Sequence, residues 1–221
     1  SLAAKTAYEE KVIPFEASPS KGPADAPIVM YEVSEFQCPF CSRVAGTVAE
    51  VADAYPDDVR IVFRHNPLSF HAEAKGASIA SMAAARQGRF WAYHDVLFAN
   101  QKALQADKLL TYAEDLGLDM AQFKKDLADP AIARKVANDQ AASVALGATG
   151  TPAFFINGVK LSGAKPLEEF KAEIDKQLVE VKALEAQGVA RDQIARRLTA
   201  QSGGTASRFI KYFIDEVPAP K

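Results

Sequence analysis

The sequence predicts an α/β fold, and two stretches of the chain indicate it. An apolar run from Ile28 to Ser34, typical of a buried strand, precedes about four helical turns and then an alternating strand over 58–64. Nearer the C-terminus, two short strands and a long helix follow about 75 residues of helical pattern. The predicted order is therefore β-α-β, a block of helices and β-β-α, with further helical residues at the end.

The composition is that of a globular protein with a sizeable core. Of the 221 residues, 48% are hydrophobic and 24% are charged, and the formal net charge is −2. This balance gives no indication of a nucleic acid partner, which would favour a basic stripe. No apolar run approaches the ~18 residues that a membrane-spanning helix needs. The first residues lack the pattern of a signal peptide, so we expect a mature or trimmed chain.

The elements group into three predicted parts. These are an N-terminal extension (1–27), a main domain (28–184) with a helical insertion over about 69–148, and a helical tail (185–221). Within the extension, residues 12–15 are predicted to form an edge strand, where the proline at position 14 is tolerated. A loop is expected to follow from Ser18 to Pro27.

Glycine, asparagine and proline residues are expected to separate the helices of the insertion. They lie at Gly88, Asn100, 117–119 and 129–130. Asp119 and Asp129 are suited to cap the helices that follow them, and Pro130 is suited to a first helical position. Beyond the insertion, Asn157-Gly158 between apolar runs predicts a β-hairpin with a type I′ turn. A last amphipathic helix is expected over 167–184.

The only two cysteines stand in the segment Cys38-Pro39-Phe40-Cys41, between the first core strand and a helix. A C-x-x-C at such a junction is typical of a thiol–disulfide redox site. Free N–H groups and the helix dipole lower the pKa of a thiol at a helix start. Cys38 is therefore predicted to be an exposed nucleophile, and Cys41, one turn inside the helix, is predicted to resolve the mixed disulfide. Exchange between sulfurs requires no cofactor and no metal.

Two other interpretations of the cysteine pair remain. A structural disulfide would close so small a loop that it stabilises the fold weakly. Half of a zinc site would need two further ligands, and none of the three histidines stands in a paired ligand spacing.

Three segments together resemble the DsbA-like thiol:disulfide oxidoreductases. They are Phe36-Gln37-Cys38-Pro39-Phe40-Cys41, the run from Val62 to Leu68, and the run from Gly150 to Gly158. The resemblance covers about 28–182 and implies a thioredoxin fold with a helical insertion. It also implies that Pro152 is in a cis peptide bond facing the cysteines, whereas an ordinary proline that opens a strand would be trans. The expected substrate-contacting residues are Pro39, Phe40, Thr151 and Pro152.

Glu32 lies on the strand before the cysteines, where thioredoxin-like enzymes often carry an acid. The resemblance implies that it is buried beneath the disulfide, has a raised pKa and exchanges a proton with Cys41. Alternatively, Glu32 lies at a strand end and reaches solvent. Glu35 and Gln37 are expected to tune the surface near the thiols. His65 and His71 are expected to have local polar or core roles.

The resemblance implies thiol–disulfide exchange on protein substrates that bear cysteines, in a periplasmic or otherwise extracytoplasmic compartment and with a separate redox partner protein. Because Phe40 replaces the histidine that DsbA carries between its cysteines, we expect a less oxidising protein, and Thr151 resembles isomerase members. The alternatives are a non-catalytic thioredoxin-fold binding module and a reducing thioredoxin-like protein.

The tail contains an apolar group that is unsuited to solvent. Its members are Phe209, Ile210, Tyr212, Phe213 and Ile214. We expect these residues to pack on the domain or to mediate self-association with a second copy of the chain.

Overall fold

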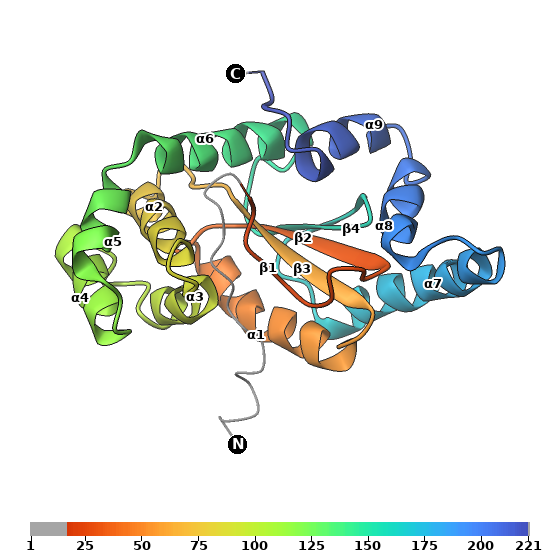
Figure 1. Cartoon of the computed structure of the whole chain (residues 1–221), viewed down its shortest axis with the longest axis horizontal. Coiled ribbons are helices and arrows are strands. Elements are labelled where there is room, and N and C mark those ends of the chain that lie inside the picture. The colour runs from red at the N-terminus through yellow and green to blue at the C-terminus, as the bar shows by residue number, and fades with distance from the viewer. Residues whose placement is uncertain (1–16, 221) are drawn as a thin grey trace.

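A five-stranded mixed sheet lies between two layers of helices in the computed structural model, which describes residues 17–220 (Figure 1). The strand order is β1-β3-β2-β4-β5; β2 and β3 are parallel, and the other neighbours are antiparallel. The strands are β1 (Ser20–Lys21), β2 (Ile28–Ser34), β3 (Val59–His65), β4 (Ala153–Ile156) and β5 (Val159–Ser162).

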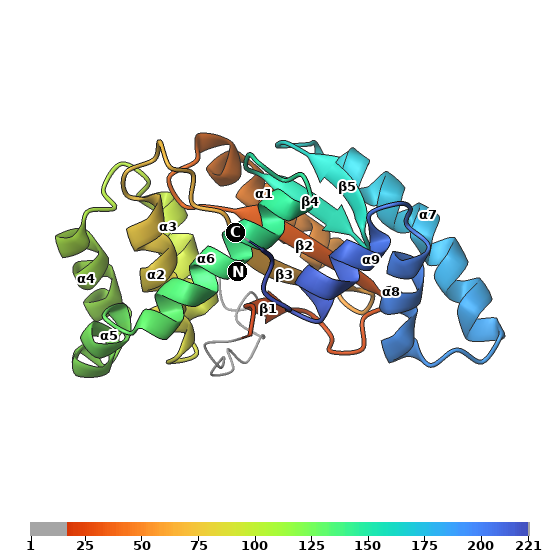
Figure 2. The ribbon, with the colours of Figure 1, turned by 90° about the horizontal axis from the view of Figure 1, so that it is seen from above.

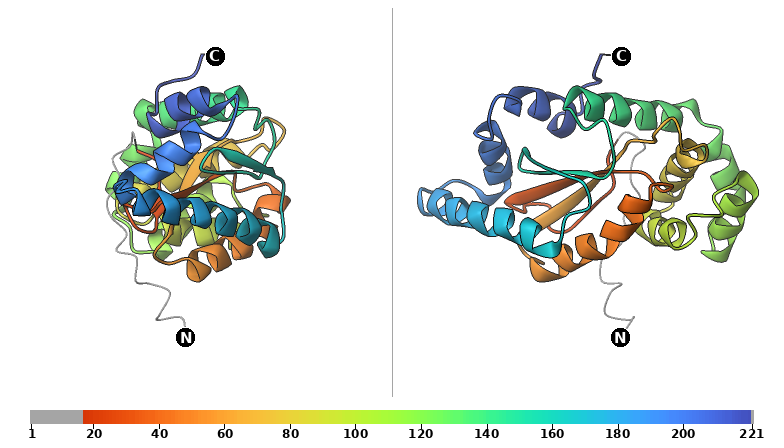
Figure 3. Two further views of the ribbon diagram at one scale, coloured as in Figure 1. Left: turned by 90° about the vertical axis from the view of Figure 1, so that its right-hand side faces the viewer. Right: turned by 180° about the vertical axis from the view of Figure 1, so that it is seen from behind.

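Helices cover both faces of this sheet and lie at both of its ends (Figures 1 and 2). On one face lie α1 (Pro39–Ala54) and α7 (Leu167–Ala186), and on the other lie α6 (Pro130–Ala145), α9 (Ala206–Phe209) and a π-helical turn (Ile210–Ile214). The rest of the insertion gathers at one end as α2 (Ala74–Ala85), α3 (Phe90–Ala99), α4 (Ala106–Asp115) and α5 (Met120–Leu127). At the opposite end, α8 (Arg191–Ala200) connects α7 to α9 (Figure 3). The predicted thioredoxin fold with a helical insertion and a helical tail is confirmed.

The capping residues explain where several elements begin. The Asp119 carboxylate accepts hydrogen bonds from the N–H groups of Ala121 and Gln122, and the Asp129 side chain caps α6 by accepting from the Ala131 N–H. In the hairpin, Asn157 and Gly158 have φ values of 44° and 85°, as a type I′ turn requires. These local signals were sufficient to predict the helix starts and the turn.

The edge of the sheet differs from the prediction. The strand predicted over 12–15 lies outside the described residues, and the structure instead places β1 within the stretch predicted to be a loop. Ser20 pairs with Val62 and Lys21 pairs with Ile61. A strand of two residues has no alternating pattern to recognise, and it forms because the chain runs antiparallel beside β3.

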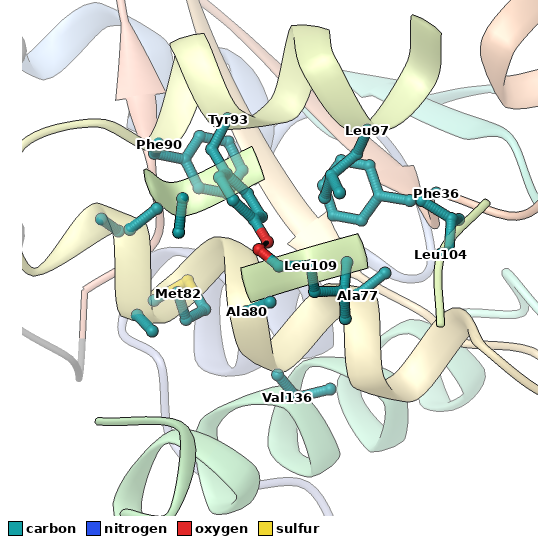
Figure 4. Close-up of a cluster of buried hydrophobic side chains, with 14 of the residues drawn as sticks. Phe36, Ala77, Ala80, Met82, Phe90, Tyr93, Leu97, Leu104, Leu109 and Val136 are labelled. Atoms are coloured by element: carbon teal, nitrogen blue, oxygen red, sulfur yellow. Dashed lines mark hydrogen bonds between the residues drawn. The ribbon is translucent and has the colours of Figure 1, made fainter. Parts of the chain in front are cut away.

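The segment before the cysteines is anchored in the helical insertion. Phe36 is fully buried, and its ring stacks on Phe63 at a centroid distance of 5.4 Å and packs against Phe98 at 5.1 Å. Figure 4 shows the Phe36 side chain beside Leu97, close to Leu104. The insertion therefore fixes the backbone that leads into the C-x-x-C.

The tail packs on the face of the sheet opposite α1. The rings of Phe209 and Phe213 lie 5.2 and 5.3 Å from the Tyr31 ring, measured between centroids. Arg64 of β3 donates to the Tyr212 carbonyl at 2.9 Å and forms an ion pair with Glu216 at 2.6 Å. The tail was expected either to pack on its own domain or to mediate self-association, and the structure shows that it packs on its own domain. Self-association is not needed to cover these rings and stays an untested prediction.

Candidate active site

The cysteine pair lies where β2 passes into α1. Cys38 is the N-cap residue of α1, and Pro39 is the first residue of the helix, where its missing N–H has no intrahelical partner to lose. The Gln101 side chain, which follows α3, donates to the carbonyl oxygens of Phe36 and Cys38, each at 2.8 Å. This pair of bonds holds the junction between strand and helix against the insertion. Nothing in the local sequence indicated Gln101, which lies 63 residues beyond Cys38.

Cys38 is buried, and the prediction of an exposed sulfur was wrong. The residue is only 2% exposed, and its thiol donates to the Thr151 carbonyl oxygen at a distance of 3.4 Å. The helix start points Cys38 outward, but the loop before β4 covers it, and that loop is remote in the sequence. The neighbours Pro39 and Phe40 remain exposed, Phe40 by 51%. A substrate would therefore meet an exposed rim around a sheltered sulfur.

The two sulfurs differ in acidity. The Cys41 thiol donates a hydrogen bond toward Cys38, and this bond is the largest cause of a lowered pKa at Cys38. The Thr151 hydroxyl and the N–H groups of Cys41 and Phe40 act in the same direction, whereas burial opposes them. The resulting pKa of Cys38 is about 5. Burial raises the pKa of Cys41 well above its usual range, and the bond to Cys38 adds to this effect. Cys38 is the acidic thiol of the pair, and Cys41 keeps its proton.

Thr151 faces Cys38 from the other side of the site, and Pro152, the next residue, is buried. Their peptide bond is cis, as the resemblance implied. The Thr151 hydroxyl is buried and has no hydrogen-bond partner among the described residues while Cys38 is a thiol. It is one of the groups that favour the Cys38 thiolate. The loop thus offers a carbonyl acceptor to the thiol and a hydroxyl donor to the thiolate.

Glu32 is buried in the middle of the sheet, so the alternative in which it reaches solvent is wrong. It is 1% exposed, and neither carboxyl oxygen has a hydrogen-bond partner within residues 17–220. Burial raises the pKa of this carboxyl, which stabilises its protonated form. Ser34, two residues later on the same side of β2, lies close enough to Cys41 for its hydroxyl to favour the Cys41 thiolate.

Glu35 and His71 form an ion pair beside the cysteines that sequence reasoning missed. The expectation that Glu35 lies at the surface was wrong, because its side chain is fully buried. One carboxyl oxygen contacts His71 Nδ1, and the other accepts from the Gln37 N–H at 2.6 Å. The partners lie 36 residues apart, so no local pattern links them. By contrast, the His65 ring is completely buried with no hydrogen-bond partner in the described part of the chain, and burial lowers its pKa to about 4, as expected for a core histidine.

The fold and the dithiol together define a thioredoxin-like protein. A family model described as Thioredoxin matches residues 16–176. Among solved structures, a thioredoxin-like oxidoreductase from Silicibacter pomeroyi is 27% identical, covers 75% of this chain and 93% of its own, and superposes with a TM-score of 0.68. A variant of α-DsbA1 from Wolbachia pipientis is 26% identical over 76% of this chain and 94% of its own, with a TM-score of 0.64. The chain belongs to the DsbA-like thioredoxin-fold family.

Curated relatives with a different name share part of the sequence. The Na(+)/H(+) antiporter NhaA of Herminiimonas arsenicoxydans is 40% identical over 144 residues, which are 65% of this chain and 23% of the relative. NhaA 3 of Salinispora tropica is 40% identical over 155 residues, 70% of this chain and 24% of the relative. The chain therefore spans about a quarter of the length of these relatives. Within residues 17–220, no helix is both long enough and apolar enough to cross a membrane.

Proposed function

We propose that this protein carries out thiol–disulfide exchange on protein substrates that bear cysteines, with Cys38 as nucleophile and Cys41 as resolving thiol. One observation carries the proposal: a thiol with a lowered pKa lies at the helix start, 3.4 Å from the Thr151 carbonyl, with a thiol of raised pKa one turn inside. Similarity to a thioredoxin-like oxidoreductase and to α-DsbA1 supports the same activity.

The oxidation of a substrate dithiol proceeds in two exchanges. A substrate thiolate attacks Cys38 of the disulfide form, the Cys38–Cys41 bond breaks, and Cys41 leaves as a thiolate that takes up a proton. The second substrate thiolate then attacks the substrate sulfur bound to Cys38, and Cys38 leaves as a thiolate. Two electrons pass from the substrate to the protein, and the reverse sequence reduces a disulfide. A separate redox partner would restore the starting form.

Glu32 and the rim of the site would support these exchanges. The buried Glu32 carboxyl, with its raised pKa, would exchange a proton with Cys41 as that thiol enters or leaves the disulfide. Pro39 and Phe40 follow Cys38 in the chain, and Thr151 faces it from the loop before β4. These residues and the buried Pro152 would contact the substrate, and Phe40 would offer it an exposed apolar surface. No metal or cofactor takes part in the proposed cycle.

We propose that the Cys38–Cys41 disulfide is a weaker oxidant than the disulfide of a protein that carries a histidine between its cysteines. A stabilised thiolate makes a dithiol pair a stronger oxidant, and Phe40 supplies no charge to the thiolate. We therefore place the protein as a general oxidoreductase or isomerase, acting in an extracytoplasmic compartment where protein disulfides persist.

Disulfide reduction in insulin, compared for the parent, Cys38→Ser and Cys41→Ser, tests the proposal. The parent should accelerate the reaction and Cys38→Ser should not, whereas Cys41→Ser should accumulate as a mixed disulfide with insulin. Equilibration of the parent with defined ratios of reduced and oxidised glutathione then fixes its direction. Equal rates for the parent and Cys38→Ser would contradict the activity and favour a non-catalytic binding module.

A further inference from the structure

We propose that the Glu35–His71 ion pair controls the charge next to Cys38, and so sets the reactivity of that sulfur. The inference deepens the proposed function and rests on it, because it concerns the same nucleophile. It concerns two residues that act through Cys38 and do not themselves enter the exchange.

The Glu35 carboxylate is held in one place beside the cysteines. Its side chain is fully buried, one oxygen contacts His71 Nδ1, and the other accepts the backbone N–H of Gln37, the residue directly before Cys38. The backbone N–H of Glu35 itself lies near Cys41 and favours the Cys41 thiolate. The backbone of Glu35 therefore lies beside Cys41, and its carboxyl group is bonded to the residue directly before Cys38.

His71 reaches the site from the loop between β3 and α2. The loop is fixed at two points, because the His71 N–H donates to the Leu68 carbonyl at 3.0 Å and the Gln37 side-chain oxygen accepts the Glu73 N–H at 2.9 Å. His71 keeps 21% of its side chain exposed, whereas the Glu35 side chain is fully buried. The loop thereby supplies a histidine to a site whose own dipeptide, Pro39-Phe40, contains none.

The electrostatic consequence follows from the signs of the charges. Burial raises the pKa of the Glu35 carboxyl; the contact with His71 opposes this by favouring the carboxylate, and the Cys38 thiolate acts against the carboxylate. Two like charges about 6 Å apart shift a pKa by about two units at an effective dielectric constant of about 20. A protonated His71, or a proton shared between His71 and Glu35, cancels the negative charge beside Cys38. Without that partner, ionised Glu35 would oppose the Cys38 thiolate.

Four variants test the pair: Glu35→Gln, His71→Ala, His71→Gln and the double variant Glu35→Gln/His71→Ala. The pKa of Cys38 is measured in each from the ultraviolet absorbance of its thiolate. Glu35→Gln removes the negative charge and should lower the pKa by about one unit, whereas His71→Ala should raise it by about one unit. The double variant should return close to the parental value, because the charge that each partner balances is removed together with that partner. Each tenfold change in the thiol–disulfide equilibrium constant of Cys38 and Cys41 should shift their reduction potential by about 30 mV. The Glu35→Gln protein should be more oxidising than the parent.

His71→Gln separates charge from packing, since glutamine retains a hydrogen-bond donor but cannot become a cation. It should resemble His71→Ala in the pKa of Cys38. Glu73→Gln is the matched control, because the backbone N–H of Glu73 makes its contact with Gln37 and is unchanged in the variant, so its shift should be much smaller. An unshifted pKa in Glu35→Gln, or shifts of the same sign in Glu35→Gln and His71→Ala, would overturn the inference. These titrations need no substrate, so a protein inactive on insulin that shows the opposed shifts would contradict the proposed function alone.

Discussion

The sulfur of Cys38 lies 3.4 Å from the carbonyl oxygen of Thr151, although 113 residues separate them in the chain. This contact brings the loop before β4 over the start of α1. It accounts for both unusual properties of Cys38: the sulfur is sheltered from solvent, and its thiolate is favoured by the buried Thr151 hydroxyl. Access to the nucleophile and its acidity therefore depend on the same loop.

Replacing Thr151 with valine should make Cys38 less acidic. Valine keeps the shape of threonine but removes the hydroxyl that is directed at the thiolate, so the pKa of Cys38 should rise by about half to one unit. The rate of alkylation as a function of pH measures the shift. Thr151→Ser retains a hydroxyl and should remain near the parent; a valine variant with parental acidity would show that the hydroxyl does not act on Cys38.

Replacing Glu32 with glutamine should stabilise the protein at alkaline pH. Because burial raises the pKa of Glu32, the folded protein retains a proton that the unfolded chain releases. Stability from this group is complete below the ordinary glutamate pKa and is lost as pH rises toward the folded-state pKa. Glutamine does not ionise, so the variant should gain about 1–3 kcal/mol over the parent at about pH 8 and little at about pH 4. Urea unfolding of the reduced proteins at both pH values measures this, and an equal difference at the two would refute it.

The tail should contribute to the stability of the domain. Phe213 is 1% exposed and packs on Tyr31 and Phe155, so Phe213→Ala should cost about 3–5 kcal/mol of unfolding free energy. Val179→Ala, at a position 70% exposed, is the control and should change stability by less than about 0.5 kcal/mol. The pKa of Cys38 should be unchanged in both, since the tail lies on the opposite face of the sheet. A Phe213→Ala protein as stable as the control would show that the tail is a separate appendage.

Much of the fold could be predicted because its signals are local. The C-x-x-C before a helix, the caps at Asp119 and Asp129, and the Asn157-Gly158 turn each depend on a few adjacent residues. Strand pairing between β2 and β3 followed from two apolar runs joined by a helix. These features needed no knowledge of distant contacts.

The parts that could not be predicted depend on distant pairs. Thr151 covers Cys38, His71 contacts the Glu35 carboxyl, and Arg64 holds the tail through Glu216. A sequence shows that such charged and polar residues exist, but not which of them the folded chain brings together. The same limit explains why Glu35 was expected at the surface, since an acidic residue is seldom buried unless a partner accompanies it.

Alkylation of the reduced protein near pH 6, with the modified cysteine mapped by mass spectrometry, tests the central claim most directly. At that pH Cys38, whose pKa is lowered to about 5, is mostly thiolate, whereas Cys41 remains protonated. The predicted result is rapid labelling of Cys38, with Cys41 unlabelled in the parent and in Cys38→Ser. Labelling of Cys41 before Cys38 would contradict the assignment of nucleophile and resolving thiol.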